Sequence, residues 1–282
     1  MKVFKTKKEL KTYFKEFRSE NSKIGFVPTM GALHKGHLSL LEKSIENNDI
    51  TIASIFVNPT QFNKKEDLEN YPRTLESDLS LLESISCDVV FIPSVKEIYT
   101  NNVSSSHFNF DGLETLMEGK YREGHFNGVG TIVKKLFEII LPTNAYFGEK
   151  DFQQLQIIRK MVEKTALDVT VVCCATHREA SGLAMSSRNA RLTTEEKEAA
   201  TIIYQTLHEV KKKIEHLPLA DINKWVIDKF KQESLFSLEY FTIAEEETLK
   251  SVTKILPKKN YRAFIAAYAR EVRLIDTISL NS

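Results

Sequence analysis

The sequence has few cysteines, no long apolar run and no excess of either charge, and each shortage excludes a class of protein. The three cysteines, Cys87, Cys173 and Cys174, are an odd number without a CxxC pair, which argues against a disulfide scaffold and a structural zinc site. No stretch approaches the roughly 18 apolar residues that span a bilayer, and the first residues lack the apolar core of a signal peptide. We therefore expect reduced thiols, a cytoplasmic location and no membrane partner.

The charges also nearly cancel, with 39 basic against 38 acidic residues. A dedicated nucleic-acid binder would show a strong positive field, so we expect no nucleic-acid partner and a small, locally recognised substrate. The length of 282 residues is enough for one large domain and a smaller one.

Apolar runs and amphipathic segments alternate along the first part of the chain. Five runs have the character of buried strands: residues 23–28, 50–59, 87–93, 144–148 and 167–176. Segments with helical spacing follow most of them, after Gly36, Arg73, Gly130 and Lys150. This alternation predicts an α/β fold with a Rossmann-like, doubly wound parallel sheet that helices cover on both faces.

The pattern changes after about residue 177. Residues 193–216 and 220–233 have the spacing of amphipathic helices, and residues 238–245 and 261–270 that of strands. We therefore predict two domains: residues 1–176 form the Rossmann-like domain, and residues 177–282 form a smaller C-terminal α+β domain.

Polar residues follow the predicted strands, and parallel sheets bind ligands at these strand ends. In PTMGALHKGH, Gly31 and Gly36 permit a tight turn, and the helix that begins near Gly36 offers N–H groups and a positive dipole end. His34 and His37 lie beside this anion site, where they can donate hydrogen bonds to phosphate oxygens. The stretch alone also fits a capped helix start with two surface histidines, whereas a zinc pair is disfavoured because no third ligand is in register.

Two further strand ends have similar chemistry. In FGEKDFQQLQ, Lys150 supplies a positive charge for phosphate, and Gln153 and Gln154 carry amides into the next helix. FVNPTQF places Asn58 and Gln61 after a third strand. Taken singly, these motifs also fit an exposed helix start and a plain Asn-Pro turn.

GLAMSSRN, residues 182–189, joins two hydroxyls to an arginine after a flexible glycine. If this loop faces the carboxyl edge of the sheet, Ser186 and Ser187 bind phosphate oxygens and Arg188 offsets the charge of a departing pyrophosphate. A solvated interdomain linker is the alternative.

Two other residues are candidates for the same site. His125 precedes a predicted helix within a glycine-rich stretch that favours close approach of a ligand, although it also fits the neighbourhood of a helix cap. Asp78 lies on a helix whose apolar positions face the core, and a carboxylate near a triphosphate can hold Mg²⁺. Such an aspartate is otherwise usually exposed to solvent.

The sequence lacks both GxxxxGK[ST] and GxGxxG, which excludes a Walker loop and a dehydrogenase fingerprint. No Ser-His-Asp or Cys-His nucleophile pattern is evident either. Cationic and hydrogen-bonding chemistry around phosphate remains, without a covalent nucleophile.

Six motifs in this order and spacing resemble the pantothenate synthetase family, the pantoate–β-alanine ligases of the HIGH-motif nucleotidyltransferase superfamily: PTMGALHKGH, FVNPTQF, YPRTLESDL, EGHFNGV, FGEKDFQQL and GLAMSSRN. The resemblance implies a two-step reaction. The carboxylate of (R)-pantoate attacks the α-phosphorus of ATP and expels pyrophosphate, and the amine of β-alanine then attacks the bound adenylate to give pantothenate and AMP. A homodimer that uses Mg²⁺ with its ATP is also implied.

The resemblance assigns roles by position. His37 is implied as the proton donor, with catalytic roles also at His34, Lys150, Ser186, Ser187 and Arg188. The implied ATP contacts are Met30, Gly31, Ala32, Leu33, His34, Lys35, Gly36, His37, Gly148, Glu149, Lys150, Asp151, the backbone of His177, Met185, Ser186, Ser187 and Arg188. The implied pantoate contacts are Met30, Gln61, His125 and Gln154. Gln61 also borders the β-alanine path, and Asp78 is the implied metal ligand. The chain departs from the family's usual pattern at His177, Ser77 and Ser181.

Two other functions stay open on the sequence alone. A nucleotidyltransferase of the same superfamily that leaves its adenylated product unreacted would need the same HKGH site, and β-alanine-dependent release of AMP would distinguish the two. A nucleotide-sensing or RNA-binding protein could keep the fold without turnover. Near-neutral charge and the presence of His34, His37 and Lys150 argue against it.

Overall fold

The computed structural model describes residues 1–17, 22–63, 65–100 and 102–281. Contacts within the chain divide it into two compact units: unit 1 is Met1–Gly148 with Gln153–Cys174, and unit 2 is Glu149–Phe152 with Ala175–Ser282. The predicted domains differ from these units chiefly in residues 149–152, whose contacts place them in unit 2. That the chain folds as two separate domains stays a prediction.

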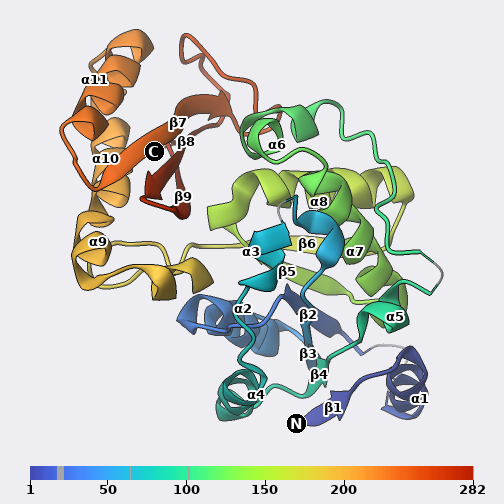
Figure 1. The fold of residues 1–282 in the computed structure, drawn as a ribbon. Helices are drawn as coiled ribbons and strands as arrows, with labels where there is room; N and C mark the ends of the chain where they lie inside the picture. Colours follow the sequence, from blue (N-terminus) through green and yellow to red (C-terminus); the bar gives the residue numbers. More distant parts are fainter. Residues whose placement is uncertain (18–21, 64, 101, 282) are drawn as a thin grey trace. The chain divides into compact units, whose positions relative to one another are not determined.

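Unit 1 is built on a six-stranded parallel sheet (Figure 1). Its strands are β1 (Lys2–Phe4), β2 (Ile24–Thr29), β3 (Ile50–Ile55), β4 (Val89–Phe91), β5 (Asn144–Gly148) and β6 (Thr170–Cys174). They lie in the order β1-β4-β3-β2-β5-β6, and every pair is parallel. The five predicted strands are confirmed. β1 was not predicted, because three residues are too few to show a period.

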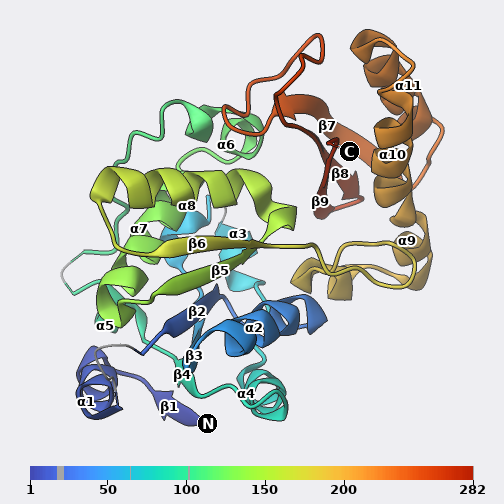
Figure 2. The same cartoon turned by 180° about the vertical axis from the view of Figure 1, so that it is seen from behind.

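Helices cover both faces of this sheet. Those of unit 1 are α1 (Lys7–Phe17), α2 (Lys35–Asn47), α3 (Lys65–Glu69), α4 (Leu75–Ser84), α5 (Val95–Ile98), α6 (Met117–Tyr121), α7 (His125–Ile140) and α8 (Phe152–Thr165), which belongs to unit 1 from Gln153 onward. On β2, Phe26 packs against Phe137 of α7 with ring centroids 6.2 Å apart, whereas Val27 clusters with Leu41 of α2 and Leu82 of α4. Because neighbouring side chains of a strand point to opposite faces, α7 lies on one face and α2 and α4 lie on the other (Figures 1 and 2). The doubly wound α/β fold is confirmed.

Helix α7 begins earlier than predicted. The sequence predicts a helix after Gly130, but α7 begins at His125, so Gly128 and Gly130 lie inside it. A Cβ atom on Gly128 would lie 2.3 Å from the carbonyl oxygen of Thr60. The glycine is therefore required by the close approach of the α7 backbone to a 3₁₀ turn, η1 (Pro59–Gln61), which outweighs its poor helix propensity.

The strand order places a topological switch point between β2 and β5. From β2 the chain continues to β3 and β4 on one side, whereas β5 and β6 extend the sheet on the other side. Open α/β sheets bind ligands at the carboxyl ends of the strands that flank such a point. The chain leaves β2 towards the HKGH motif and leaves β5 at Gly148, so both segments start from the switch point.

The described part of unit 2 contains three α-helices, followed along the chain by a three-stranded antiparallel sheet. Its elements are α9 (Thr194–Ala199), α10 (Thr201–Lys213), α11 (Leu219–Lys231), β7 (Phe236–Glu245), β8 (Tyr261–Ala269) and β9 (Val272–Ser279), and the strand order is β7-β8-β9. Leu207 of α10 and Val226 of α11 share a core with Ile265 of β8. The α+β class is confirmed, but the helix predicted over 193–216 is α9 followed by α10, and β9 was not predicted. In the described part of the chain, no helix is long and apolar enough to cross a membrane.

Candidate active site

The two histidines of the HKGH motif cap helix α2. His34 is the N-cap residue, and its Nδ1 accepts a hydrogen bond from the backbone N of Gly36 at 3.1 Å. His37 Nδ1 accepts a longer one, 3.3 Å, from the backbone N of His34, and the two ring centroids are 4.0 Å apart. Because each Nδ1 accepts, a neutral ring must carry its proton on Nε2. A capped helix start and a phosphate site are therefore compatible, since each Nε2–H donor lies on the side of its ring away from the cap.

Asp78 fixes the turn between β2 and α2. Its carboxylate, 1% exposed, accepts hydrogen bonds from Ala32 N at 3.0 Å, Leu33 N at 2.7 Å and Thr74 Oγ1 at 3.1 Å. Gly31 and Ala32 have φ angles of +80° and +50°, which for the alanine is an unfavourable left-handed conformation. The contacts thus give Asp78 a structural role, and its role as a magnesium ligand stays a prediction.

The side chains that the structure describes do not form a metal cage. No group of three or more His, Cys, Asp or Glu residues that could hold a metal ion occurs among the residues that the structure describes. Mg²⁺ in phosphate-transferring enzymes is bound by one or two carboxylates together with substrate phosphates and water. The donor set here fits a metal carried by the nucleotide better than one resident in a protein site.

Three of the predicted pantoate residues meet in unit 1. Gln61 is 9% exposed, and its Nε2 donates to Met30 Sδ at 3.0 Å. His125, at the start of α7, donates from Nδ1 to the carbonyl oxygen of Gln61 at 2.9 Å. A thioether is a weak acceptor, so the Gln61 amide can exchange it for a carboxylate or hydroxyl oxygen of a ligand.

Asn58 and Tyr99 orient the Gln61 amide from behind. Asn58 Nδ2 donates to Gln61 Oε1 at 3.1 Å and to Gly128 O at 3.1 Å, while Asn58 Oδ1 accepts from the Tyr99 hydroxyl at 2.6 Å. Burial raises the pKa of the Tyr99 phenol further, which favours the protonated form that donates this bond. The sequence indicated Asn58 as a polar residue at a strand end, with a plain turn as the alternative. It gave no signal for Tyr99, because that residue lies 41 positions further along the chain, outside every motif.

The two glutamines of α8 have different surroundings. Gln153 is 3% exposed; its Oε1 accepts from Glu118 N at 3.0 Å, and its Nε2 donates to Leu113 O and Leu116 O at 2.8 Å. All of these partners are backbone groups, so Gln153 has a structural role. Gln154 is half-buried, and its contact with pantoate stays a prediction.

The predicted phosphate residues that follow β5 belong to unit 2. Lys150 Nζ lies 3.0 Å from Asp151 Oδ2, and the lysine side chain is 17% exposed. The neighbouring carboxylate holds the ammonium group in a defined place while leaving part of it accessible. A negatively charged ligand can therefore reach it.

The residues at 177 and 185–188 are brought together within unit 2. The carbonyl oxygen of His177 accepts a hydrogen bond from Met185 N at 3.0 Å. Ser186 caps the 3₁₀ turn η4 (Ser187–Arg191), because its Oγ accepts from Arg188 N at 3.2 Å. The backbone of His177 and the MSSR loop are thus adjacent, although the chain separates them by a short reversal.

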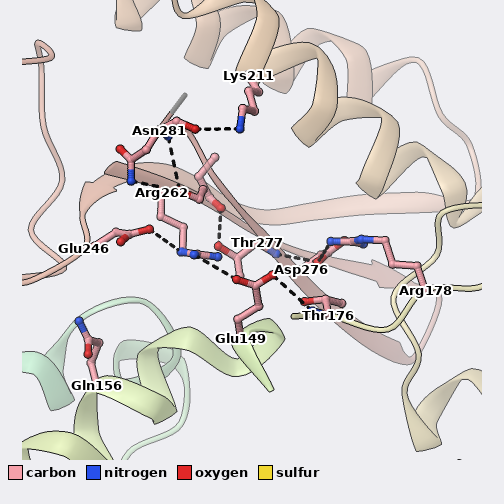
Figure 3. Close-up of polar contacts among 12 residues, drawn as sticks. Glu149, Gln156, Thr176, Arg178, Lys211, Glu246, Arg262, Asp276, Thr277 and Asn281 are labelled. Atoms are coloured by element: carbon pink, nitrogen blue, oxygen red, sulfur yellow. Dashed lines mark hydrogen bonds and ion pairs between the residues drawn. The ribbon is translucent and has the colours of Figure 1, made fainter. Parts of the chain in front are cut away.

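An ion pair between partly buried Arg178 and buried Asp276 anchors this reversal (Figure 3). Arg178 donates from Nη1 and Nη2 to the two oxygens of Asp276 at 2.6 Å and 3.0 Å, and Nη1 also donates to Gly182 O at 3.1 Å. Burial raises the pKa of the Asp276 carboxyl, and the Arg178 charge opposes that shift. Neither residue belongs to a motif that sequence reasoning selected as functional. Their pairing joins residues 98 positions apart, which no local pattern encodes.

Known proteins resemble this chain over its whole length. A model of the family described as Pantoate-beta-alanine ligase matches residues 2–279. A protein of Flavobacterium psychrophilum named pantothenate synthetase is 53% identical, and one of Christiangramia forsetii with the same name is 51% identical; each match covers 100% of both chains. The crystal structure of pantothenate synthetase from Thermus thermophilus has a TM-score of 0.91 at 36% identity and covers 100% of both chains. A pantoate-β-alanine ligase from Francisella tularensis, crystallised with β-γ ATP and β-alanine, has a TM-score of 0.84 at 36% identity and covers 100% of this chain and 98% of that one.

Proposed function

The chain belongs to the pantoate–β-alanine ligase family and is an ATP-dependent ligase that joins pantoate to β-alanine, and we propose that it works through a pantoyl adenylate. In the first step, a carboxylate oxygen of (R)-pantoate bonds to the α-phosphorus of ATP, and the bond to the departing pyrophosphate breaks. In the second step, the amine of β-alanine bonds to the acyl carbon, loses a proton and expels AMP, which gives pantothenate.

The paired histidines of α2 carry this proposal. Both Nε2–H groups can donate, together with the positive end of the helix dipole, where negative charge develops on the phosphates during in-line displacement. His37, the predicted proton donor, presents its Nε2–H to the phosphates in this way, with His34 beside it. This arrangement needs no covalent nucleophile on the protein.

The Gln61 cluster is the proposed pantoate site. Gln61 releases its weak bond to Met30 and donates to pantoate, while His125 holds the Gln61 backbone. Gln154 supplies a second amide, and Gln61 also borders the path of β-alanine. Buried Asn58 keeps the Gln61 amide in one orientation, which favours a single pose of the substrate.

The groups of unit 2 are the proposed contacts of the nucleotide. Lys150, Ser186, Ser187 and Arg188 bind phosphate oxygens, with backbone contacts at Gly148–Asp151, Met185 and His177. Mg²⁺, when bound to the ATP, supplies neutralisation of the phosphate charge. The protein's own residues bind and orient the reacting groups and donate hydrogen bonds to them.

We also propose a homodimer in the cytoplasm. The free thiols of buried Cys87 and half-buried Cys174 fit a reducing compartment. Sedimentation should show a dimer at micromolar concentration, and a monomer alone would contradict the proposed assembly.

The test is to supply ATP, Mg²⁺ and pantoate with and without β-alanine and to follow pyrophosphate and the amide product separately. Pyrophosphate release should require pantoate, and the amide should require β-alanine as well. His37→Ala and Lys150→Ala should each slow pyrophosphate release by at least about a hundredfold. Lys43→Ala, on the exposed side of α2, is the matched control and should leave the rate unchanged. Unchanged rates in both site variants would refute the assignment, and adenylate without amide would favour a plain nucleotidyltransferase.

A further inference from the structure

One arginine of the small sheet contacts both ends of the segment that carries Lys150. Arg262 Nη2 lies 3.3 Å from Glu149 Oε2 (Figure 3), and the Arg262 guanidinium carbon lies 4.1 Å from the centre of the Phe152 ring. Phe152 also packs against Phe264, with ring centroids 6.1 Å apart. Lys150 lies between these two contacts along the chain. The position of the lysine backbone therefore depends on Arg262.

Glu149 extends this arrangement to a second nucleotide-binding segment. Its Oε2 pairs with Arg262, and its Oε1 accepts a hydrogen bond from Thr176 N at 3.3 Å. Thr176 immediately precedes His177, whose backbone is a proposed nucleotide contact. A single carboxylate thus connects the chain near Lys150 and the chain near His177 to the same guanidinium.

The surroundings of Arg262 suit positioning better than stabilisation. Its side chain is 5% exposed, and its Nε donates to Glu246 Oε1 at 3.0 Å. Its Nη1 is buried and has no hydrogen-bond partner among the described residues. A buried charge with one unsatisfied donor contributes little net stability compared with an apolar side chain of similar size. Its contacts with Glu149 and Phe152 hold the segment around Lys150 in place. An apolar side chain could not form the ion pair with Glu149.

We propose that Arg262 is a positioning residue of the ligase reaction that acts through Glu149. It touches no substrate; it holds Lys150 and the backbone at His177 where ATP binds, and the inference rests on the function proposed above. Loss of Arg262 then impairs ATP binding and adenylate formation, whereas the response to β-alanine is unaffected.

The experiment compares Arg262→Met and Arg262→Lys with the matched control Arg273→Met. Arg273 lies on β9 of the same sheet, and its Nε donates to Glu239 Oε2 at 2.8 Å, so its loss breaks a comparable ion pair away from Lys150. The measurements are the kcat and KM for ATP in pantoate-dependent pyrophosphate release, the KM for β-alanine, and the Tm with and without ATP.

Arg262→Met should lower kcat/KM for ATP by about tenfold to a hundredfold, the scale of a small misplacement of a binding group. Arg262→Lys should recover part of the loss, because an ammonium group can still reach Glu149. Arg273→Met should lower the Tm but leave the KM for ATP and the stabilisation by ATP unchanged. The double variant Glu149→Gln with Arg262→Met should lose no more activity than the more severe single variant, since each substitution alone already breaks the same Glu149–Arg262 contact.

Equal effects of Arg262→Met and Arg273→Met on the KM for ATP would overturn the proposal, as would additive losses in the double variant. Should Arg262→Met not fold, Arg262→Lys and Glu149→Gln provide the same comparison. A wild-type enzyme that shows no pantoate-dependent pyrophosphate release would instead refute the proposed function, so the two failures are distinguishable.

Discussion

Replacing Asp78 with asparagine separates a structural role from a metal-binding role for this buried carboxylate. In the native protein both oxygens accept backbone N–H groups of the β2–α2 turn, Ala32 N and Leu33 N. An asparagine has one carbonyl oxygen and one NH₂ group, so it can accept only one of these bonds and opposes the other N–H with its own. The substitution keeps the size of the side chain and changes only its hydrogen-bonding pattern.

The expected cost follows from these bonds. A hydrogen bond to a charged group contributes about 1.5–3 kcal/mol, and leaving a buried N–H unsatisfied costs about 1–3 kcal/mol. We therefore expect Asp78→Asn to lower the free energy of unfolding by about 2–4 kcal/mol, a large part of the about 5–15 kcal/mol that is typical of a folded protein. Since Ala32 has a left-handed backbone that this carboxylate supports, adenylate formation should slow as well.

Urea unfolding and pantoate-dependent pyrophosphate release at several Mg²⁺ concentrations measure the two effects. We expect lower stability and a slower rate, with the Mg²⁺ concentration for half-maximal rate unchanged. Glu76→Gln, at an exposed position of the same helix, is the control and should change neither quantity. Unaltered stability together with a raised Mg²⁺ requirement would refute the structural role and identify Asp78 as a metal ligand.

The remaining predictions concern packing and the thiols. Gly128→Ala places a Cβ 2.3 Å from Thr60 O, so it should lower the free energy of unfolding by about 1–3 kcal/mol. It should also raise the KM for pantoate but not the KM for ATP, and an unchanged KM for pantoate would contradict the proposed site. Burial raises the pKa of both Cys87 and Cys174 to about 11, so iodoacetamide at pH 8 should label exposed Cys173 first. Mass spectrometry measures the labelling, and equal labelling of all three thiols would contradict this prediction. The folded chain keeps these two thiols protonated to a higher pH than the unfolded chain does. Their contribution to the free energy of unfolding is therefore fully present below pH 9 and is lost as the pH rises through about 11.

The sequence was sufficient for features that depend on local pattern. Apolar runs identified five of the six parallel strands, and the polar residues behind them identified strand ends, including the exit of β2 with His34 and His37. The six motifs identified the family, which the whole-length matches confirm. These signals are short in sequence, because a strand, its turn and the next helix start are contiguous.

Contacts between distant positions could not be predicted in this way. Asn58 contacts Tyr99 across 41 positions and Glu149 contacts Arg262 across 113, and neither partner is marked by composition or spacing. The early start of α7 was missed for a related reason. A glycine at position 128 indicates a helix breaker until the Thr60 backbone is known to lie against it. Tertiary packing, not local preference, decides such positions.

The capping arrangement at α2 links the fold directly to the chemistry. Protonation of either ring would put a hydrogen on Nδ1, where it would face the backbone N–H of Gly36 or of His34 and break the cap. The start of the helix therefore favours the neutral tautomer with its proton on Nε2, which is the form that donates to a phosphate oxygen. Two histidines at this spacing fit the task because they satisfy backbone donors with one nitrogen and keep the other as a donor. An aspartate would cap the helix equally well, but it has no proton to donate to a phosphate oxygen, and its charge would repel the nucleotide.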